Sequence, residues 1–313
     1  MGVDVRLVVG RPLRGFDTSA DRAAAEQRRF IEGFWARMSP EDPSSELSAL
    51  NDSPREAVRA SPLLRQLVHA AVWAASYSQG LVDPTLLGDL EGLDHGAERE
   101  PAAPVDDAAT PERQAAAPDP LARWRSIEVD DAAGLVRRPP GLRIGSGGVG
   151  RALVADLVGT ALSGHARYVV DCGRELVAGG IEAAARPYEL DLRHPLTGER
   201  VHTLRVSSGG VATSGLDMRE WHTGNSFAKH PIDPARGCPA WTGVISATAL
   251  GESALEAATL SKAALLLGPE GARRALAAHG GLVVHDDGDV ELIGLADPAQ
   301  GAPLSAPSAG ATG

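Results

Sequence analysis

The order of strand-type and helix-type segments is the feature that most restricts the fold of this chain. Downstream of residue 120, short β-type runs follow one another, among them "ARYVVDCG", "YELDLRHP", "HTLRVSSGGVATSG", "GVISATAL" and "GLVVHDDGDVELIG". Two helical segments interrupt them, at about residues 148–163 and 255–268. Because strands and helices do not alternate regularly, the order favours an α+β fold of mixed short-stranded sheets packed with helices over a doubly wound parallel sheet.

The first part of the chain adds one strand and two longer helices. "VDVRLVVG" is typical of a strand, and "TSADRAAAEQRRFIEGFWARM" of a helix capped by Thr18 or Ser19. "SPLLRQLVHAAVWAASYSQG" is predicted to be a helix with Ser61 as its cap and Gly80 at its end. We expect a single domain over residues 1–295.

Two segments have the composition of disordered chain. Residues 95–120, "HGAEREPAAPVDDAATPERQAAAPDP", are rich in Pro, Ala and acidic residues and carry almost no bulky apolar side chain. Such a composition cannot offset the entropy lost on ordering, so we expect a disordered surface insertion here. The low-complexity tail, residues 296–313, is expected to be disordered as well.

Net charge, cysteines and hydropathy exclude several classes of protein. The 313 residues carry 30 Lys+Arg against 41 Asp+Glu, a net charge of −11, without a block of basic residues, which disfavours a nucleic-acid binder. Cys172 and Cys238 stand in no CxxC or CxxH spacing and make no disulfide framework. The N-terminus lacks the apolar region of a secretion signal, and no stretch is long enough to span a bilayer. We therefore expect a soluble cytoplasmic protein.

The glycine-rich segment "IGSGGVGRALVADLV" resembles a phosphate-binding turn. Gly145, Gly147 and Gly150 follow G-x-G-x-x-G at the start of a helix, and Asp171 comes at the end of the next strand-type run. In dinucleotide-binding proteins such glycines let a phosphate approach the helix N-terminus, and the later acid binds a ribose. The preceding run, "RRPPGLRI", is a weak strand, however. These residues alone leave open a Rossmann-type site and a glycine-rich turn without a ligand.

Two further segments group polar side chains in a way that suits a ligand. "GGVATSG", residues 209–215, places the hydroxyls of Thr213 and Ser214 between glycines, where hydroxyls and backbone N–H groups can hold a ribose or phosphate. "KHPIDPARGCP" braces His230 and Asp233 with three prolines, which limits their freedom. Taken alone, each pattern is also typical of an ordinary turn.

A single lysine stands on an otherwise small and apolar helical face. In "LEAATLSKAALLLG", residues 255–268, Lys262 lies one turn from Ala258 and Leu266, and neither can pair with an ammonium group. Gly268 predicts the end of this helix. Lys262 is either a cation placed for a ligand or a side chain that extends to solvent.

Several motifs occur in one order over residues 30–295. They include "SSELSALN", which follows S-E-[LI]-x-x-[LI]-N, "GLVDPTL", which follows G-x-[FV]-D-P-T, and "IGSGGVGRALVAD", which follows D-L-G-G-[IV]-A-K-G-x-x-x-D. "VATSG" and "HPIDPARGCP", the latter following H-x-[IL]-D-P-x-T-G-x-P, come later. In this series the chain resembles the FAD:protein FMN transferases, the ApbE-type flavin transferases. The resemblance accounts for the glycine-rich segment without a Rossmann fold.

The resemblance implies a single ApbE-like domain and an enzyme that cleaves the diphosphate of FAD. Such an enzyme attaches FMN through a phosphoester to a Thr or Ser of a target protein and releases AMP. The implied partners are FAD and a protein acceptor of FMN, without nucleic acid or membrane. The implied catalytic residues are His230, Asp233 and Lys262. The implied FAD-binding residues are Glu46, Gly147, Gly148, Arg151, Glu175, Thr213, Ser214, Gly215 and Arg236.

The chain departs from the family pattern where a metal is expected. In the family, A-D-A-L-S-T places an Asp and a Thr on one helical face as Mg²⁺ ligands, and Ala258 and Lys262 occupy these positions here. Mg²⁺ takes oxygen ligands and an ammonium repels it, so we expect no metal ligand in this chain. Lys262 beside a diphosphate can neutralise part of its charge instead, assisted by Arg174 and Arg236. The alternatives are a non-catalytic flavin-binding or interaction protein of this fold and an NAD(P)-dependent oxidoreductase.

Overall fold

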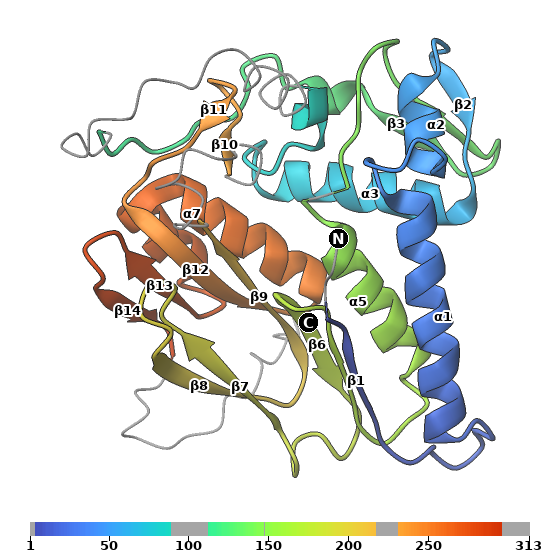
Figure 1. The fold of residues 1–313 in the computed structure, drawn as a ribbon, viewed down its shortest axis with the longest axis vertical. Coiled ribbons are helices and arrows are strands. Elements are labelled where there is room, and N and C mark those ends of the chain that lie inside the picture. The colour runs from blue at the N-terminus through green and yellow to red at the C-terminus, as the bar shows by residue number, and fades with distance from the viewer. Residues whose placement is uncertain (1–3, 89–111, 147, 217–230, 296–313) are drawn as a thin grey trace, which may run out of the picture.

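A seven-stranded sheet forms the centre of the molecule. The computed structural model describes residues 4–88, 112–146, 148–216 and 231–295. Within them the strand order is β1-β5-β6-β9-β12-β13-β14, and every neighbouring pair is antiparallel (Figure 1). The strands are β1 (Arg6–Val9), β5 (Tyr168–Asp171), β6 (Glu175–Gly179), β9 (Gly209–Gly215), β12 (Val244–Gly251), β13 (Gly281–His285) and β14 (Val290–Ile293). The predicted α+β class is confirmed, and the sheet excludes the parallel arrangement that a Rossmann-type site needs.

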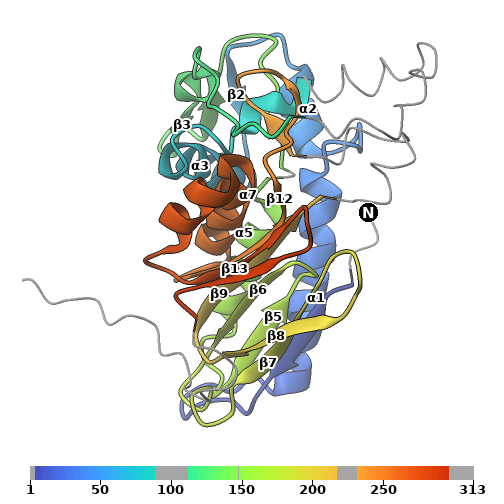
Figure 2. The same ribbon diagram turned by 90° about the vertical axis from the view of Figure 1, so that its left-hand side faces the viewer.

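Helices cover one face of this sheet and a two-stranded ribbon covers the other (Figures 1 and 2). Helix α7 (Ala254–Leu276) packs on β9 and β12, and α5 (Gly150–Ala161) packs on β5, β6 and α7. The ribbon consists of β7 (Tyr188–Arg193) and β8 (Arg200–Val206). Its Leu204 and Val206 join the same apolar cluster as Leu176 and Val211 of the sheet.

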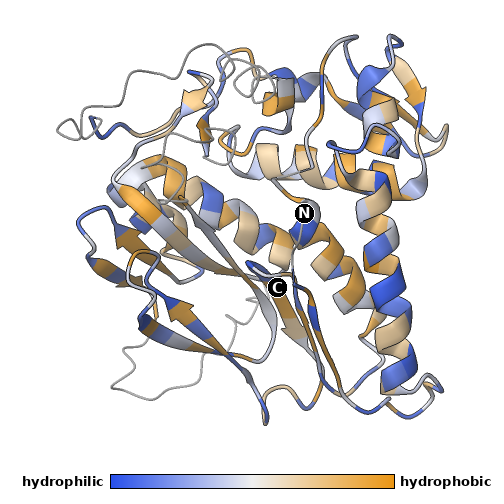
Figure 3. Ribbon diagram, viewed as in Figure 1, coloured by the Kyte–Doolittle hydropathy of each residue, from blue (hydrophilic) through white to orange (hydrophobic). Residues whose placement is uncertain are grey.

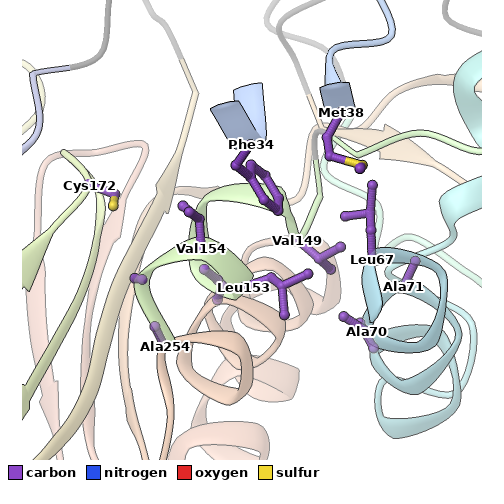
Figure 4. Close-up of a cluster of buried hydrophobic side chains, with 14 of the residues drawn as sticks. Phe34, Met38, Leu67, Ala70, Ala71, Val149, Leu153, Val154, Cys172 and Ala254 are labelled. Carbon is purple, nitrogen blue, oxygen red and sulfur yellow. The ribbon is translucent and has the colours of Figure 1, made fainter. Parts of the chain in front are cut away.

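A second unit of helices completes the apolar core beside α5. It contains α1 (Ala20–Met38), α2 (Glu46–Asp52) and α3 (Pro62–Tyr77), with two 3₁₀ turns at Pro84–Leu86 and Arg123–Ser126. A small sheet joins β2 (Ala57–Arg59), β4 (Leu135–Arg137) and β3 (Glu128–Asp130). Figure 4 shows Phe34, Met38, Leu67, Val149 and Leu153 of the core that these helices share. Figure 3 shows that α1 has long hydrophilic stretches, whereas much of the large sheet is apolar.

Local signals fix the starts of α1 and α3 as predicted. Ser19 and Ser61 accept hydrogen bonds from backbone N–H groups of the first turns of α1 and α3. Ser253 does the same for α7. Gly268 has φ +71°, which interrupts α7 where the sequence predicts its end, although helical geometry resumes beyond it up to Leu276.

Residues 112–120 are packed against the rest of the domain, contrary to the expected disorder. The backbone N–H of Gln114 donates to the carbonyl of Trp241 (2.8 Å), and that of Ala116 donates to the carbonyl of Leu266 (2.8 Å). Arg113 forms an ion pair with Asp286 at 2.6 Å. The expectation is wrong here because these backbone groups find partners more than a hundred residues away, which local composition does not reveal. Residues 95–111 and the tail 296–313 lie outside the described residues.

Among the described residues, none of the helices is long and apolar enough to cross a membrane.

Candidate functional site

A cluster of charged side chains lies where α5, β6 and α7 meet. Arg151, in the first turn of α5, holds the carboxylate of Glu175 with both arms: Nε lies 2.8 Å from Oε2, and Nη2 donates to Oε1 at 3.1 Å. Glu175 begins β6 and is only 4% exposed. The charges of Glu175, Arg151 and Arg174 all act on Lys262, which lies partly buried on α7. We call Arg151, Arg174, Glu175 and Lys262 the cationic cluster.

The cationic cluster has more positive than negative charge. Burial lowers the pKa of Lys262, the negative charge of Glu175 opposes this, and Arg151 and Arg174 lower the pKa further. Three basic side chains and one carboxylate therefore influence this site, and that carboxylate is already bound by Arg151. A bound anion would stabilise such an arrangement.

A carboxylate of α5 fixes the start of α7 in this site. The backbone N–H groups of Ala254 and Leu255 donate to the two carboxylate oxygens of Asp156, at 2.8 and 2.9 Å. Burial raises the pKa of Asp156, and these two hydrogen bonds oppose the rise. A Cβ on Gly210 would lie 2.2 Å from the backbone of Ser253, so only glycine lets β9 approach the helix start so closely. Asp156 thereby sets where Lys262 lies relative to Arg151.

The two hydroxyls of "VATSG" lie on opposite faces of the sheet. The Ser214 hydroxyl is 2.8 Å from that of Ser261 on α7, next to Lys262. The Thr213 hydroxyl is 2.9 Å from that of Thr248 on β12. Because neighbouring residues of a strand alternate in direction, the structure brings only Ser214 to the face of α7. A Cβ added at Gly215, the next residue, would lie 3.2 Å from the carbonyl oxygen of Ile245.

A pocket of about 130 Å³ lies on the face with Thr213, between the sheet and the β7–β8 ribbon. Neither Glu175 nor Lys262 lines it, whereas Arg174 does. Arg174 is therefore the one member of the cationic cluster that also lines this pocket. The polar residues that line the pocket are Asp171, Arg174, Asp191, Arg193, Thr213, Ser246 and Thr248.

The loop with Asp233 is held by hydrogen bonds to residues 112–117. Asp233 is 1% exposed, and its Oδ1 accepts from the backbone N–H groups of Ala117 (3.2 Å) and Ala235 (3.0 Å). Its Oδ2 lies 2.6 Å from Nε of Arg236, and Arg236 also donates to the carbonyl of Ala115 at 3.2 Å. Both residues thus hold the loop in place. His230, the third polar residue expected here, lies outside the described residues.

Glu46 supports a helix start apart from the cationic cluster. Its carboxylate accepts from the backbone N–H and the hydroxyl of Ser61, at 2.6 and 2.8 Å, and from Arg37 at 2.6 Å. Burial alone would raise the pKa of Glu46, but these hydrogen bonds outweigh it and the pKa is lowered. Its observed hydrogen bonds therefore stabilise the turn before α3.

Asn51 secures the glycine-rich turn, a role that the motif alone does not disclose. Its amide donates to the carbonyl of Ile144 (2.9 Å) and accepts from the N–H of Ile144 (2.8 Å). Gly148, in this turn, lies beside Val82: a Cβ added at Gly148 would be 3.6 Å from the Val82 side chain. Gly147 lies outside the described residues. Asn51 thus orients the turn that leads into α5 and Arg151.

Comparison with known proteins gives one family. The model of the ApbE family matches residues 1–284. The FAD:protein FMN transferase of Klebsiella pneumoniae is 25% identical over 229 residues, which are 70% of this chain and 63% of that protein. That of Salmonella typhimurium is 27% identical over 161 residues, 49% of this chain and 46% of that protein. The chain thus matches less than two thirds of the length of both relatives.

Solved structures of this family share the fold. The ApbE protein from Thermotoga maritima superposes with a TM-score of 0.71 at 22% identity, over 94% of each chain. Flavin Transferase ApbE from Vibrio cholerae gives a TM-score of 0.68 at 19% identity, over 94% of this chain and 98% of that one. The predicted ApbE-like fold is confirmed.

Proposed function

Because the chain belongs to the ApbE family, we propose that it binds FAD and transfers the FMN moiety to a Thr or Ser hydroxyl of a target protein. The named relatives are FAD:protein FMN transferases, which supports the choice of substrate. The observation that carries the proposal for this chain is the cationic cluster, where Lys262 and Arg174 add positive charge near the ion pair of Arg151 with Glu175. A dianionic diphosphate matches that surplus charge.

In this reaction the acceptor hydroxyl oxygen attacks the phosphorus of the FMN half. A new P–O bond forms, the bond from that phosphorus to the bridging oxygen breaks, and AMP leaves with the bridging oxygen. The hydroxyl proton passes to a base, for which His230 remains the sequence prediction. Arg151 and Lys262 contribute by stabilising the charge that develops on the phosphoryl oxygens, because cations fixed in a partly buried site act on it strongly.

Release of AMP from FAD tests this proposal. The purified protein is incubated with FAD and an acceptor peptide containing Thr or Ser, and AMP is followed by chromatography while the peptide is followed by mass. We expect AMP to appear together with a peptide heavier by one FMN less one water. Arg28→Gln, on the exposed side of α1 where Arg28 forms an ion pair with Glu32, is the matched control and should retain the wild-type rate.

The second candidate is a protein that binds flavin without transferring it. The observation that favours it is the use of Asp233 inside the protein, where Oδ1 accepts from Ala117 and Ala235 and Oδ2 forms an ion pair with Arg236. A carboxylate used in this way holds the loop and is not free to move a proton. Tight FAD binding with no release of AMP under any acceptor condition would favour this candidate over the transferase.

A further inference from the structure

The cationic cluster lacks the donors that a divalent cation requires. Mg²⁺ takes near-octahedral oxygen ligands, carboxylates above all. Among the described residues there is no group of three His, Cys, Asp or Glu side chains that can hold a metal ion. Glu175 is bound by both arms of Arg151, Ala258 offers a buried methyl group, and Lys262 offers an ammonium. These side chains do not fit the Mg²⁺ that the family resemblance implies.

We infer that this protein binds the diphosphate of FAD without a divalent cation, with the ammonium of Lys262 supplying the positive charge at that place. The inference rests on the proposed FAD binding. It adds that the substrate binds as the free dinucleotide and not together with a divalent cation. A lysine can take this role because its charge reaches the phosphate oxygens directly through N–H donors.

The surroundings of Lys262 favour a ligand anion over an internal partner. The carboxylate that acts on it, Glu175, is already neutralised by Arg151. Arg174 adds a second cation, and in the described part of the chain it takes part in none of the ion pairs. A partly buried cation that has no carboxylate of its own among the described residues is costly, and a dianion would remove much of that cost.

The neighbouring hydroxyls add neutral donors to the same place. Ser261 precedes Lys262 on α7 and is 0% exposed, and its hydroxyl meets that of Ser214 at 2.8 Å. One of these two hydroxyls donates to the other, so a proton of the pair is left for a further acceptor. Ser261 can donate either to Ser214 or to the carbonyl of Ala258, 3.1 Å away, and in the first case the proton of Ser214 is left to serve the ligand. Cations and a hydroxyl thus converge without any metal ligand.

Binding of FAD with and without Mg²⁺ tests the inference. Calorimetric titrations with FAD are run in EDTA and in millimolar MgCl₂, on the wild type, Lys262→Met and Lys262→Arg. We expect wild-type dissociation constants that agree within about twofold in the two buffers. Lys262→Met, which keeps the length of the side chain without its charge, should weaken FAD binding about 10- to 100-fold, the scale of a hydrogen bond to a charged group. Lys262→Arg should retain most of the affinity.

Riboflavin, which carries no phosphate, is the matched control ligand. It should bind the wild type and Lys262→Met equally, which shows that the variant is folded. Wild-type binding of FAD that appears only with Mg²⁺ overturns the inference and leaves the proposed function standing. Failure of FAD to bind in either buffer overturns both. Unchanged FAD affinity in Lys262→Met removes the role assigned to Lys262.

Discussion

Arg236 and Lys262, which the motif resemblance sets against a threonine of the family pattern, have different electrostatic surroundings in the fold. Arg236 lies 2.6 Å from the carboxylate of Asp233 and donates to a backbone carbonyl of residues 112–117. Lys262 lies beside a carboxylate that Arg151 already neutralises. Within the described residues, Arg236 has a carboxylate of its own, whereas Lys262 shares Glu175 with Arg151.

The comparison distinguishes a basic residue with a structural role from a basic residue that indicates a bound ligand. A basic residue that arrives together with an internal partner can hold a loop, as Arg236 does with Asp233. A basic residue without such a partner lowers stability in the free protein unless something outside the chain compensates its charge. The loop with Asp233 should therefore respond to mutation mainly in stability, and the cationic cluster mainly in binding.

Asp233→Ala should give the largest loss of stability. It removes the acceptor of two backbone N–H groups and leaves Arg236 without its carboxylate, which we expect to lower the free energy of unfolding by about 2–4 kcal/mol. Urea denaturation measures this loss, and limited proteolysis should show faster cleavage near residues 112–117. Arg236→Ala, whose side chain is 42% exposed, should lose only about 0–1 kcal/mol. Equal losses in both variants would contradict a structural role centred on the buried carboxylate.

Asp156→Ala should give the next largest effect, through the start of α7. Loss of the two hydrogen bonds to Ala254 and Leu255 should lower the free energy of unfolding by about 1–2 kcal/mol, as loss of a helix cap does. Because α7 carries Lys262, FAD affinity should fall as well, while Asp156→Asn, which keeps one acceptor, should lie between. Denaturation and FAD titration of the same samples check this. An affinity that stays at the wild-type value despite the lost stability would show that α7 keeps its position without the cap.

Ser214→Ala and Thr213→Val compare the two faces of β9. Ser214 faces α7 and Thr213 faces the pocket under the β7–β8 ribbon. Ser214→Ala should weaken FAD binding by about 0.5–1.5 kcal/mol, the value of one neutral hydrogen bond, and Thr213→Val should leave the affinity unchanged. The measurement is the FAD dissociation constant. A loss confined to Thr213→Val would place the ligand on the ribbon side and would break the assignment of the cationic cluster.

The sequence predicts features whose signals are local. Ser19 and Ser61 cap the expected helices, and the hairpin around Asp287 and Gly288 joins β13 to β14. The motif series predicts the ApbE-like fold, because motifs in a fixed order carry information about the whole chain. The alternation of side chains along a strand also predicts that Thr213 and Ser214 point to opposite faces of the sheet. The prediction of one site with both hydroxyls does not take this alternation into account.

Contacts between distant segments are the part that the sequence does not disclose. Asp156 meets Ala254 across 98 positions, and Asn51 meets Ile144 across 93. Neither residue has a local pattern that names its partner. The Asp233 carboxylate accepts from the backbone N–H of Ala117, a contact that the sequence does not disclose, because a proline- and alanine-rich composition conceals that residues 112–117 pack against the loop.

The smallest expected effect is a pH dependence of the free energy of unfolding of the ligand-free protein, caused by the titration of Lys262. Burial holds the pKa of Lys262 below the value of an unfolded lysine, about 10.4, so between the two values the unfolded chain binds more protons. The free energy of unfolding therefore rises with pH through that window, and the full cost of the buried charge is present below the folded pKa. Lys262→Met removes this cost.

Lys262→Met should therefore be more stable than the wild type by about 0.5 kcal/mol near neutral pH, and the difference should shrink as the pH approaches the unfolded value of about 10.4. Urea denaturation of ligand-free protein, from about pH 7 to about pH 10, measures it. Lys262→Arg is the control, because a guanidinium stays charged throughout and should bring no gain. A Lys262→Met variant less stable than the wild type near neutral pH would show that the ammonium already has an internal counter-charge. The contrast with Arg236 would then fail, because both substitutions would be balanced within the protein.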